Sequence, residues 1–519
     1  MNLIITDMMP RFNADYGHGT PIRTPGAYRI ATILDCPVVD YFFHVSYDSQ
    51  IKILNKYLTD DSRYLGISLT NMRGHTKDFS QHSLFDKIRP LGTKSNGLFY
   101  YHKQVSKILK YVKNNFPQIK VIIGGGQITN ISQKGLKFVD EHIDYIFTGE
   151  SDIAIASMEK LIAYDVWNLG KKPYIFTKAK VIHSDKDYPL TKEYVADNMS
   201  MDHKRINSCF LPNEWTFVEI SRGCIFNCFF CSYRHSNKRR SIQSIKEELI
   251  RNYNEYGTTR YRLLDDTFND NRKKVVDICK MFRELPFDIE WHSYARTDVF
   301  STHPDLIDIV YDSGCKYLKF GLESTNDIAL KTANKMLGHT KANKVLEEVD
   351  KRTNGNLYTH SNFIIGLPGE TPESIRHTFE WLKSCPLKTY SFTTWHRDRY
   401  DEAATDIKEM SVFGKDEHNI QGYGNDWVHD TMTSTQAYEL YNEGRELLSN
   451  VRGPFWLGSD IYPILRTYGI AHEDVDLYMN FVMDQDDGIK KWFENKFTNH
   501  TKEYFSKLDI PVKIRNAVA

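Results

Sequence analysis

Three cysteines stand close together in the stretch TFVEISRGCIFNCFFCSY. Cys224, Cys228 and Cys231 have the spacing C-x3-C-x2-C, and they follow a short apolar run, Thr216–Ile220, which predicts a buried strand. The number of cysteines is informative. A closed structural zinc site takes four ligands, whereas a cubane iron–sulfur cluster held by three cysteines keeps one iron free for another ligand. The spacing therefore favours a [4Fe-4S] cluster with one open iron.

Two other interpretations of the three cysteines stay open from the residues alone. A zinc ion could be held with His235 as a further ligand, or the cysteines could be buried thiols that bind nothing. With zinc or a redox cluster that does no turnover, the chain would be a binding or regulatory module instead of an enzyme.

The cysteine motif resembles that of the radical S-adenosylmethionine (radical SAM) enzymes. In that family the methionine amino and carboxylate groups of SAM chelate the open iron, and an electron from the cluster cleaves SAM to a 5′-deoxyadenosyl radical. The resemblance implies an enzyme with a [4Fe-4S] cluster and SAM as cofactors and an external electron donor of the flavodoxin or ferredoxin type. It also implies that Phe230 lies against the adenine. The substrate, a small molecule or a peptide, is not identified by these residues.

Six alternating strand and helix signals follow from the first strand onward, in residues 214–397. Units of this type predict a partial (β/α)6 barrel, as in the radical SAM family, with chemistry at the carboxyl ends of the strands. The expected strands are Thr216–Ile220, Tyr261–Leu264, Ile289–Tyr294, Tyr317–Gly321, Thr359–Ile365 and Tyr390–Thr394.

Polar residues at the strand ends are the expected SAM contacts. Asp265 and Asp266 end the second strand, where the family places a group that binds the methionine amino nitrogen; an acid cluster at a helix N-terminus is the simpler interpretation. Arg296 follows the third strand and could reach the methionine carboxylate.

The fourth and fifth strands end in segments that resemble the family more closely. Glu323 and Ser324 in KFGLEST match its ribose-contacting positions. Gly366 lies in IIGLPGET, a segment typical of the family, whose flat strand end lies against the adenine.

Residues 1–185 show five further strand and helix units, which predict an open, doubly wound parallel sheet of the Rossmann or flavodoxin type. Ligands of such sheets lie at the carboxyl ends of the strands. Small polar residues and glycines occupy those ends, and tight turns alone would also use the glycines. These residues are Ser68, Thr70, Gly125 and Gly149.

The segments RTPGAYRIATIL, VIIGGGQIT and DYIFTGES resemble the cobalamin-binding domain that precedes the barrel in one radical SAM subgroup. The resemblance implies a corrinoid at the four positions just named and methyl transfer as a reaction. The chain lacks the Asp-x-His-x-x-Gly loop that some cobalamin domains use, so cobalamin binding stays open.

The remaining segments are less informative. Residues 186–213 read as a linker, and residues 398–519 as a helical region that could cap a substrate. In and just before that region, polar and aromatic side chains are places to look for a substrate face, although aromatics at helical spacing usually form core. They are His396, Arg397, Asp398, Arg399, Trp427, His429, Trp456 and Asp460.

Composition places the chain among globular proteins. Its 519 residues are 41% hydrophobic and 26% charged, with 67 basic and 67 acidic side chains, so no net field favours nucleic acid or a membrane. The N-terminal residues lack the apolar core of a signal peptide, and no stretch is long enough to span a bilayer. The other five cysteines show no paired spacing. We expect a cytoplasmic protein with reduced thiols.

Overall fold

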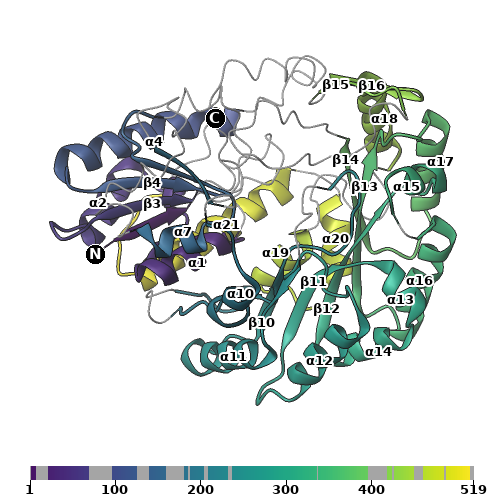
Figure 1. Ribbon diagram of the computed structural model, residues 1–519, viewed down its shortest axis with the longest axis horizontal. Coiled ribbons are helices and arrows are strands. Elements are labelled where there is room, and N and C mark those ends of the chain that lie inside the picture. Colours follow the sequence, from purple (N-terminus) through teal and green to yellow (C-terminus); the bar gives the residue numbers. More distant parts are fainter. Residues whose placement is uncertain are drawn as a thin grey trace.

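The computed structural model describes residues 2–6, 21–68, 96–125, 140–158, 180–184, 188–203, 209–231, 237–335, 337–395, 418–423, 426–448, 460–483 and 487–514. Two six-stranded sheets form the two halves of the molecule, and the last helices, in residues 461–507, lie between them (Figure 1). This is the predicted architecture of a doubly wound domain, a partial barrel and a helical C-terminal region.

All neighbouring strands of the N-terminal sheet are parallel, in the order β2-β1-β3-β4-β5-β6. The first five positions follow the flavodoxin-like order, whose ligand crevice opens where the chain switches direction, between β1 and β3. The strands are β1 (Leu3–Thr6), β2 (Val38–Val39), β3 (Tyr64–Ser68), β4 (Lys120–Gly124), β5 (Tyr145–Thr148) and β6 (Lys180–His183).

One feature of this domain differs from the sequence prediction: the sixth strand, β6, was not predicted as a member of the sheet. Strand β2 ends at Val39, because Tyr41 takes a left-handed conformation (φ 58°) and the 3-10 turn η1 (Phe42–His44) follows. Helices α1 (Pro25–Leu34), α2 (Tyr47–Tyr57), α4 (Asn96–Asn115) and α7 (Asp152–Ala156) complete the domain, and α10 (Lys192–Asn198) follows it.

The second sheet is the partial barrel, with all strands parallel in the order β14-β13-β12-β11-β10-β7. Its outward faces pack on the helices in one large apolar core. The six strands match the six predicted ones within two residues at either end. They are β7 (Thr216–Glu219), β10 (Arg260–Leu264), β11 (Glu290–Ala295), β12 (Cys315–Glu323), β13 (Tyr358–Ile365) and β14 (Thr389–Thr394).

Local signals fix the barrel helices. Ser241 accepts a hydrogen bond from the Ser244 N–H at the start of α11 (Ile242–Tyr256), and Gly257 ends that helix with φ 64°. Thr371 forms a capping box with Ser374 before α17. The other helices are α12 (Arg272–Arg283), α13 (Thr297–Thr302), α14 (Asp305–Asp312), α15 (Asp327–Thr332), α16 (His339–Arg352) and α17 (Pro372–Leu382).

The C-terminal region begins with a small antiparallel sheet that the helical prediction did not include: β15 (Gln421–Tyr423), β16 (Asp426–His429) and β17 (Met432–Thr433). The helices α18 (Ser434–Leu447), α19 (Ile461–Thr467), α20 (Val475–Met483) and α21 (Asp487–Lys507) follow. Of these, α19 packs Tyr462 on barrel residues Tyr317 and Tyr358, and α21 returns to the N-terminal domain.

Candidate functional site

The cysteine loop is closed at its base by a two-residue ribbon. Strand β8 (Ser221–Arg222) pairs antiparallel with β9 (Lys238–Arg239), so both ends of the loop are fastened together. The tip is held from the barrel: the Phe229 N–H donates to the Ala333 carbonyl at 3.0 Å, and the Asn334 amide donates to the Asn227 carbonyl at 2.9 Å. The loop is therefore anchored on both sides at the carboxyl edge of the barrel sheet.

The three cysteines have polar neighbours suited to ligand sulfurs. Cys228 is buried, and its Sγ accepts a hydrogen bond of 3.3 Å from the Arg296 guanidinium. Cys224 is half-buried, with Sγ 3.3 Å from the Thr267 hydroxyl. Cys231 is half-buried. A guanidinium donor suits a sulfur that carries negative charge.

The donor set of three cysteine thiols in one loop, with a guanidinium donor on one of the sulfurs, fits a [4Fe-4S] cluster, in which each cysteine binds a different iron. Among the described residues, no group of three or more His, Cys, Asp or Glu side chains is found that could hold one metal ion. His235 lies outside the described residues.

The two carboxylates after β10 point in different directions. Asp265 is buried and pairs with Lys274, whose Nζ is 2.6 Å from Oδ2. Asp266 is exposed, and its Oδ2 accepts from the N–H of Gly223, next to Cys224, at 3.0 Å. Only Asp266 of this pair lies beside the cysteine loop.

Arg296 is held in a fixed orientation at the same edge. Its Nε and Nη2 donate to Asp298, with Nη2 2.6 Å from Oδ2, and its guanidinium carbon lies 3.8 Å from the centre of the Phe226 ring. The contacts with Asp298 and Cys228 use three of the five guanidinium N–H groups. Two remain for another partner.

Lys335 joins two further predicted positions. Its Nζ is 3.3 Å from Glu323 Oε1 and 5.8 Å from the centre of the Phe230 ring. Glu323 has a positive φ of 71° at a register shift between β12 and β13. A non-glycine residue in that conformation is uncommon and often marks a functional position.

Glu370, which the sequence analysis quoted without a role, ties the ends of β12 and β13 together. Its Oε1 accepts from the Ser324 hydroxyl at 2.6 Å, and its Oε2 accepts from the N–H groups of Gly366 at 2.9 Å and Leu367 at 3.3 Å. Burial outweighs these hydrogen bonds and raises the pKa of Glu370 to about 7.

Gly366 is in contact with β16 of the small C-terminal sheet. The Trp427 and His429 rings are stacked 5.1 Å apart, both are buried, and His429 Nε2 donates to the Gly366 carbonyl at 3.1 Å. Burial lowers the pKa of His429, and Nδ1 accepts from the Thr431 N–H, so the ring is neutral with its proton on Nε2. Both rings are packed in the interior, and Asp460 is also buried and pairs with Lys319 at 2.8 Å.

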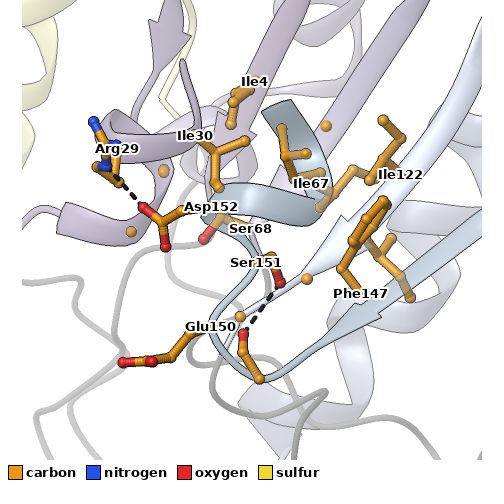
Figure 2. Close-up of a pocket in the computed structure, with 18 of the residues that line it drawn as sticks. Ile4, Arg29, Ile30, Ile67, Ser68, Ile122, Phe147, Glu150, Ser151 and Asp152 are labelled. Atoms are coloured by element: carbon orange, nitrogen blue, oxygen red, sulfur yellow. Dashed lines mark hydrogen bonds and ion pairs between the residues drawn. The ribbon is translucent and has the colours of Figure 1, made fainter. Parts of the chain in front are cut away.

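A separate cavity of about 230 Å³ opens at the carboxyl end of the N-terminal sheet (Figure 2). Its lining is largely apolar and includes the predicted positions Ser68, Gly125 and Gly149. Glu150, Ser151 and Asp152 also line it, with Asp152 directed to Arg29 and the Ser151 hydroxyl to the Gly149 carbonyl, and none of the described lining residues is a histidine. The apolar lining residues include Ile4, Ile30, Ile67, Ile122, Ile123, Phe147 and Ile155.

One lining residue of this cavity comes from the cysteine loop. Arg222, two positions before Cys224, reaches the cavity and pairs with Asp152. The sequence analysis assigned no role to this arginine. Several predicted positions lie outside the described residues: Thr70, His396, Arg397, Asp398, Arg399 and Trp456.

Comparisons with known proteins agree with this geometry. Residues 218–382 match the family model described as the Radical SAM superfamily. A curated relative, "Uncharacterized methyltransferase PH0819" of Pyrococcus horikoshii, is 25% identical over 311 residues, which cover 58% of this chain and 65% of the relative. The chain thus spans slightly less than two thirds of that protein's length.

Two solved structures share the fold. TsrM of Kitasatospora setae, a radical S-adenosylmethionine methyltransferase, aligns with a TM-score of 0.54 and 13% identity over 76% of this chain and 72% of its own. OxsB, a cobalamin-dependent S-adenosylmethionine radical enzyme, aligns with a TM-score of 0.52 and 13% identity over 88% of this chain and 58% of its own. At this identity the likeness concerns the fold alone.

Proposed function

The chain belongs to the radical SAM superfamily, and from this premise we propose that it is an enzyme that reductively cleaves SAM at a [4Fe-4S] cluster and transfers a methyl group with the help of a corrinoid. The observation that supports the proposal most is the position of the cysteine loop. It lies at the carboxyl edge of the barrel sheet, with the Arg296 guanidinium on the Cys228 sulfur.

In this proposal Cys224, Cys228 and Cys231 hold the cluster, which when bound supplies the electron that splits SAM into methionine and a 5′-deoxyadenosyl radical. Asp266 binds the amino group of the methionine part, and the two free N–H groups of Arg296 bind its carboxylate. The electron comes from an external donor of the flavodoxin or ferredoxin type.

The rest of SAM extends along the strand ends. Glu323 and Ser324 bind the ribose, and Phe230 lies against the adenine together with the strand end at Gly366. The adenine then rests on the peptide of Gly366, because the direction of its missing Cβ is occupied by Trp427.

The N-terminal cavity takes an apolar, ring-sized part of the corrinoid, which when bound carries the methyl group. Its volume of about 230 Å³ exceeds the ~150 Å³ of an apolar cavity that holds benzene. The acceptor is an unactivated carbon or phosphorus of a small molecule or peptide. Two names support methyl transfer: the Pyrococcus relative and TsrM are both called methyltransferases, and a TsrM structure has cobalamin and a [4Fe-4S] cluster bound.

The cluster and its chemistry are tested by anaerobic reconstitution with iron and sulfide, followed by SAM and dithionite. We expect a brown protein that releases 5′-deoxyadenosine and methionine slowly without substrate. The variant with Cys224, Cys228 and Cys231 all replaced by alanine should stay folded and colourless, while Cys209→Ser, a half-buried thiol outside the loop, should keep the cluster. Iron retained at the wild-type level in the triple variant would refute the assignment.

The corrinoid is tested by adding hydroxocobalamin during anaerobic refolding and desalting. We expect about one corrinoid per chain, and a loss of binding in Gly125→Phe, because this glycine lines the cavity with φ 114°. The control is Gly257→Phe, which also places a side chain at a positive φ, 64°, but in open space away from the cavity. Wild-type protein without corrinoid would remove methylcobalamin chemistry from the proposal and leave SAM cleavage intact.

A further inference from the structure

Arg222 connects the N-terminal cavity to the cysteine loop through its guanidinium. Nη1 donates to Asp152 Oδ2 at 2.5 Å and Nη2 to Asp152 Oδ1 at 3.4 Å, while Nε donates to Glu219 at the end of β7. Glu150 stands near the same nitrogen, 4.0 Å from Nη1. The arginine is thus shared between the turn after β5 and the last residue of the first barrel strand.

Asp152 is the far end of this link and is itself fixed. It is buried at the start of α7, and Arg29 of α1 donates to its Oδ1 at 2.7 Å. Burial alone would raise the pKa of Asp152, but Arg222 and Arg29 outweigh burial and hold it below the usual value. Both arginines and Asp152 line the cavity, and Figure 2 shows Arg29 and Asp152 joined at its wall.

The near end of the link is the ribbon that closes the cysteine loop. Arg222 pairs with Lys238 across β8 and β9, and Lys238 Nζ is 3.6 Å from Glu150 Oε2. Both strands of the ribbon therefore reach the turn that lines the cavity. A ligand that orders this turn also orders the base of the loop in which Cys224 lies.

We propose that Arg222 is a positioning residue that couples the two cofactor sites, so that corrinoid in the cavity and a cluster in the cysteine loop stabilise each other's binding. The coupling rests on the proposed function and extends it. It is reciprocal by thermodynamic necessity, since each ligand must change the affinity of the other by the same factor. No other described side chain of the cysteine loop lines the cavity.

The test measures hydroxocobalamin binding to cluster-free and to reconstituted protein under anaerobic conditions. In the wild type we expect at least about fivefold tighter binding when the cluster is present, the lower end of typical couplings. In Arg222→Gln the ratio should fall to about one. A residue with a merely structural role would weaken binding in both states and leave the ratio unchanged.

Arg239→Gln is the matched control, because Arg239 lies on the same ribbon but pairs with Asp270 of the barrel, 2.8 Å away. It should keep the wild-type ratio. If Arg222→Gln does not fold, Asp152→Asn breaks the same ion pair from the cavity side. The conservative variant Arg222→Lys should show a ratio between those of Arg222→Gln and the wild type.

The outcomes are distinct. A wild-type ratio of one, or a ratio that survives in Arg222→Gln or Asp152→Asn, overturns the coupling while corrinoid binding stands. A wild-type protein that binds no hydroxocobalamin in either state overturns the coupling together with the corrinoid part of the proposed function.

Discussion

Trp427 lies so close to Gly366 that a Cβ on this glycine would stand 2.6 Å from the indole Cη2 and 2.9 Å from Cζ2. The glycine also has φ 92°, a conformation that other residues rarely adopt. The C-terminal sheet is therefore in direct contact with the strand end at which we place the adenine. The shape of that strand end depends on a segment outside the family match, which ends at residue 382.

Gly366→Ala should lower the free energy of unfolding by about 2–5 kcal/mol, the sum of left-handed strain and overpacking. Urea unfolding of the cluster-free protein measures this loss. In the background of Trp427→Leu the same change should cost less, about 1–2 kcal/mol of backbone strain plus the contact with the Ala437 Cβ at 3.0 Å, which stays. Two substitutions whose effects simply add would show that the ring and the glycine do not interact energetically.

Glu370→Gln should change the pH dependence of stability. The wild-type carboxyl has its pKa raised to about 7 by burial, so between pH 4.5 and 7 the folded protein keeps a proton that the unfolded chain releases. The stability contribution of the protonated acid is complete below the unfolded pKa and is lost as pH rises through 7. Relative to the glutamine variant, the wild type should lose roughly 3 kcal/mol between pH 4 and pH 8.

The check is urea unfolding of both proteins at the two pH values, since all other titrating groups cancel in the difference. Glutamine can accept from the Gly366 and Leu367 N–H groups as glutamate does. Parallel pH profiles for the two proteins would mean that folding does not change the pKa of Glu370.

Asp460→Asn should destabilise the barrel by about 3–5 kcal/mol, because it leaves the Lys319 ammonium buried without its partner. The double variant Lys319→Met, Asp460→Leu should recover most of that loss, since a buried ion pair is often replaced by apolar side chains at little cost. Thermal unfolding of the three variants measures both effects. A double variant as unstable as Asp460→Asn would indicate a role for the pair beyond mutual charge compensation.

Arg23→Met should lower stability by about 3–5 kcal/mol through the same mechanism. Arg23 donates to Glu214 at 2.6 Å and to Asp40 at 3.2 Å in a site without solvent exposure, and its loss leaves two carboxylates facing each other. The matched control is Arg376→Met, an exposed arginine paired with Glu443, which should cost at most about 1 kcal/mol. Equal losses in the two variants would contradict the role of burial.

Apart from β6, the strands of both sheets were predictable because strand signals alternate with helices that have clear start or stop residues, as with Ser241 and Gly257 around α11. Strand β6 escaped prediction because its four residues lie in a segment rich in lysine and aspartate, and its place in the sheet comes from pairing with β5. The small C-terminal sheet has strands of two to four residues, too short for a periodic pattern.

The sequence predicted which candidate residues lie at the carboxyl edge of the barrel sheet, because those residues directly follow the predicted strands. Asp266, Arg296 and Phe230 meet at the cysteine loop because parallel strands end at one edge. The sequence did not predict which of the neighbouring residues Asp265 and Asp266 faces the cysteine loop. The Asp265 side chain instead pairs with Lys274, nine positions away on a helix. Arg222 was missed for a related reason, since its partner Asp152 lies 70 residues earlier in another domain.

Helix α21 brings the last part of the chain back to the first. Tyr504 accepts from the Asp40 N–H at 3.0 Å, across a separation of 464 residues, and His500 contacts Glu214 at 3.0 Å. At about 5–20 residues per second, the ribosome needs roughly 25–90 s to add the residues between these two partners. During that interval the surface around Arg23, Asp40 and Tyr41 has no cover from α21. The N-terminal domain therefore leaves the ribosome first, but its contacts with α21 form last. Until α21 has been made, the uncovered surface is accessible to chaperones and proteases.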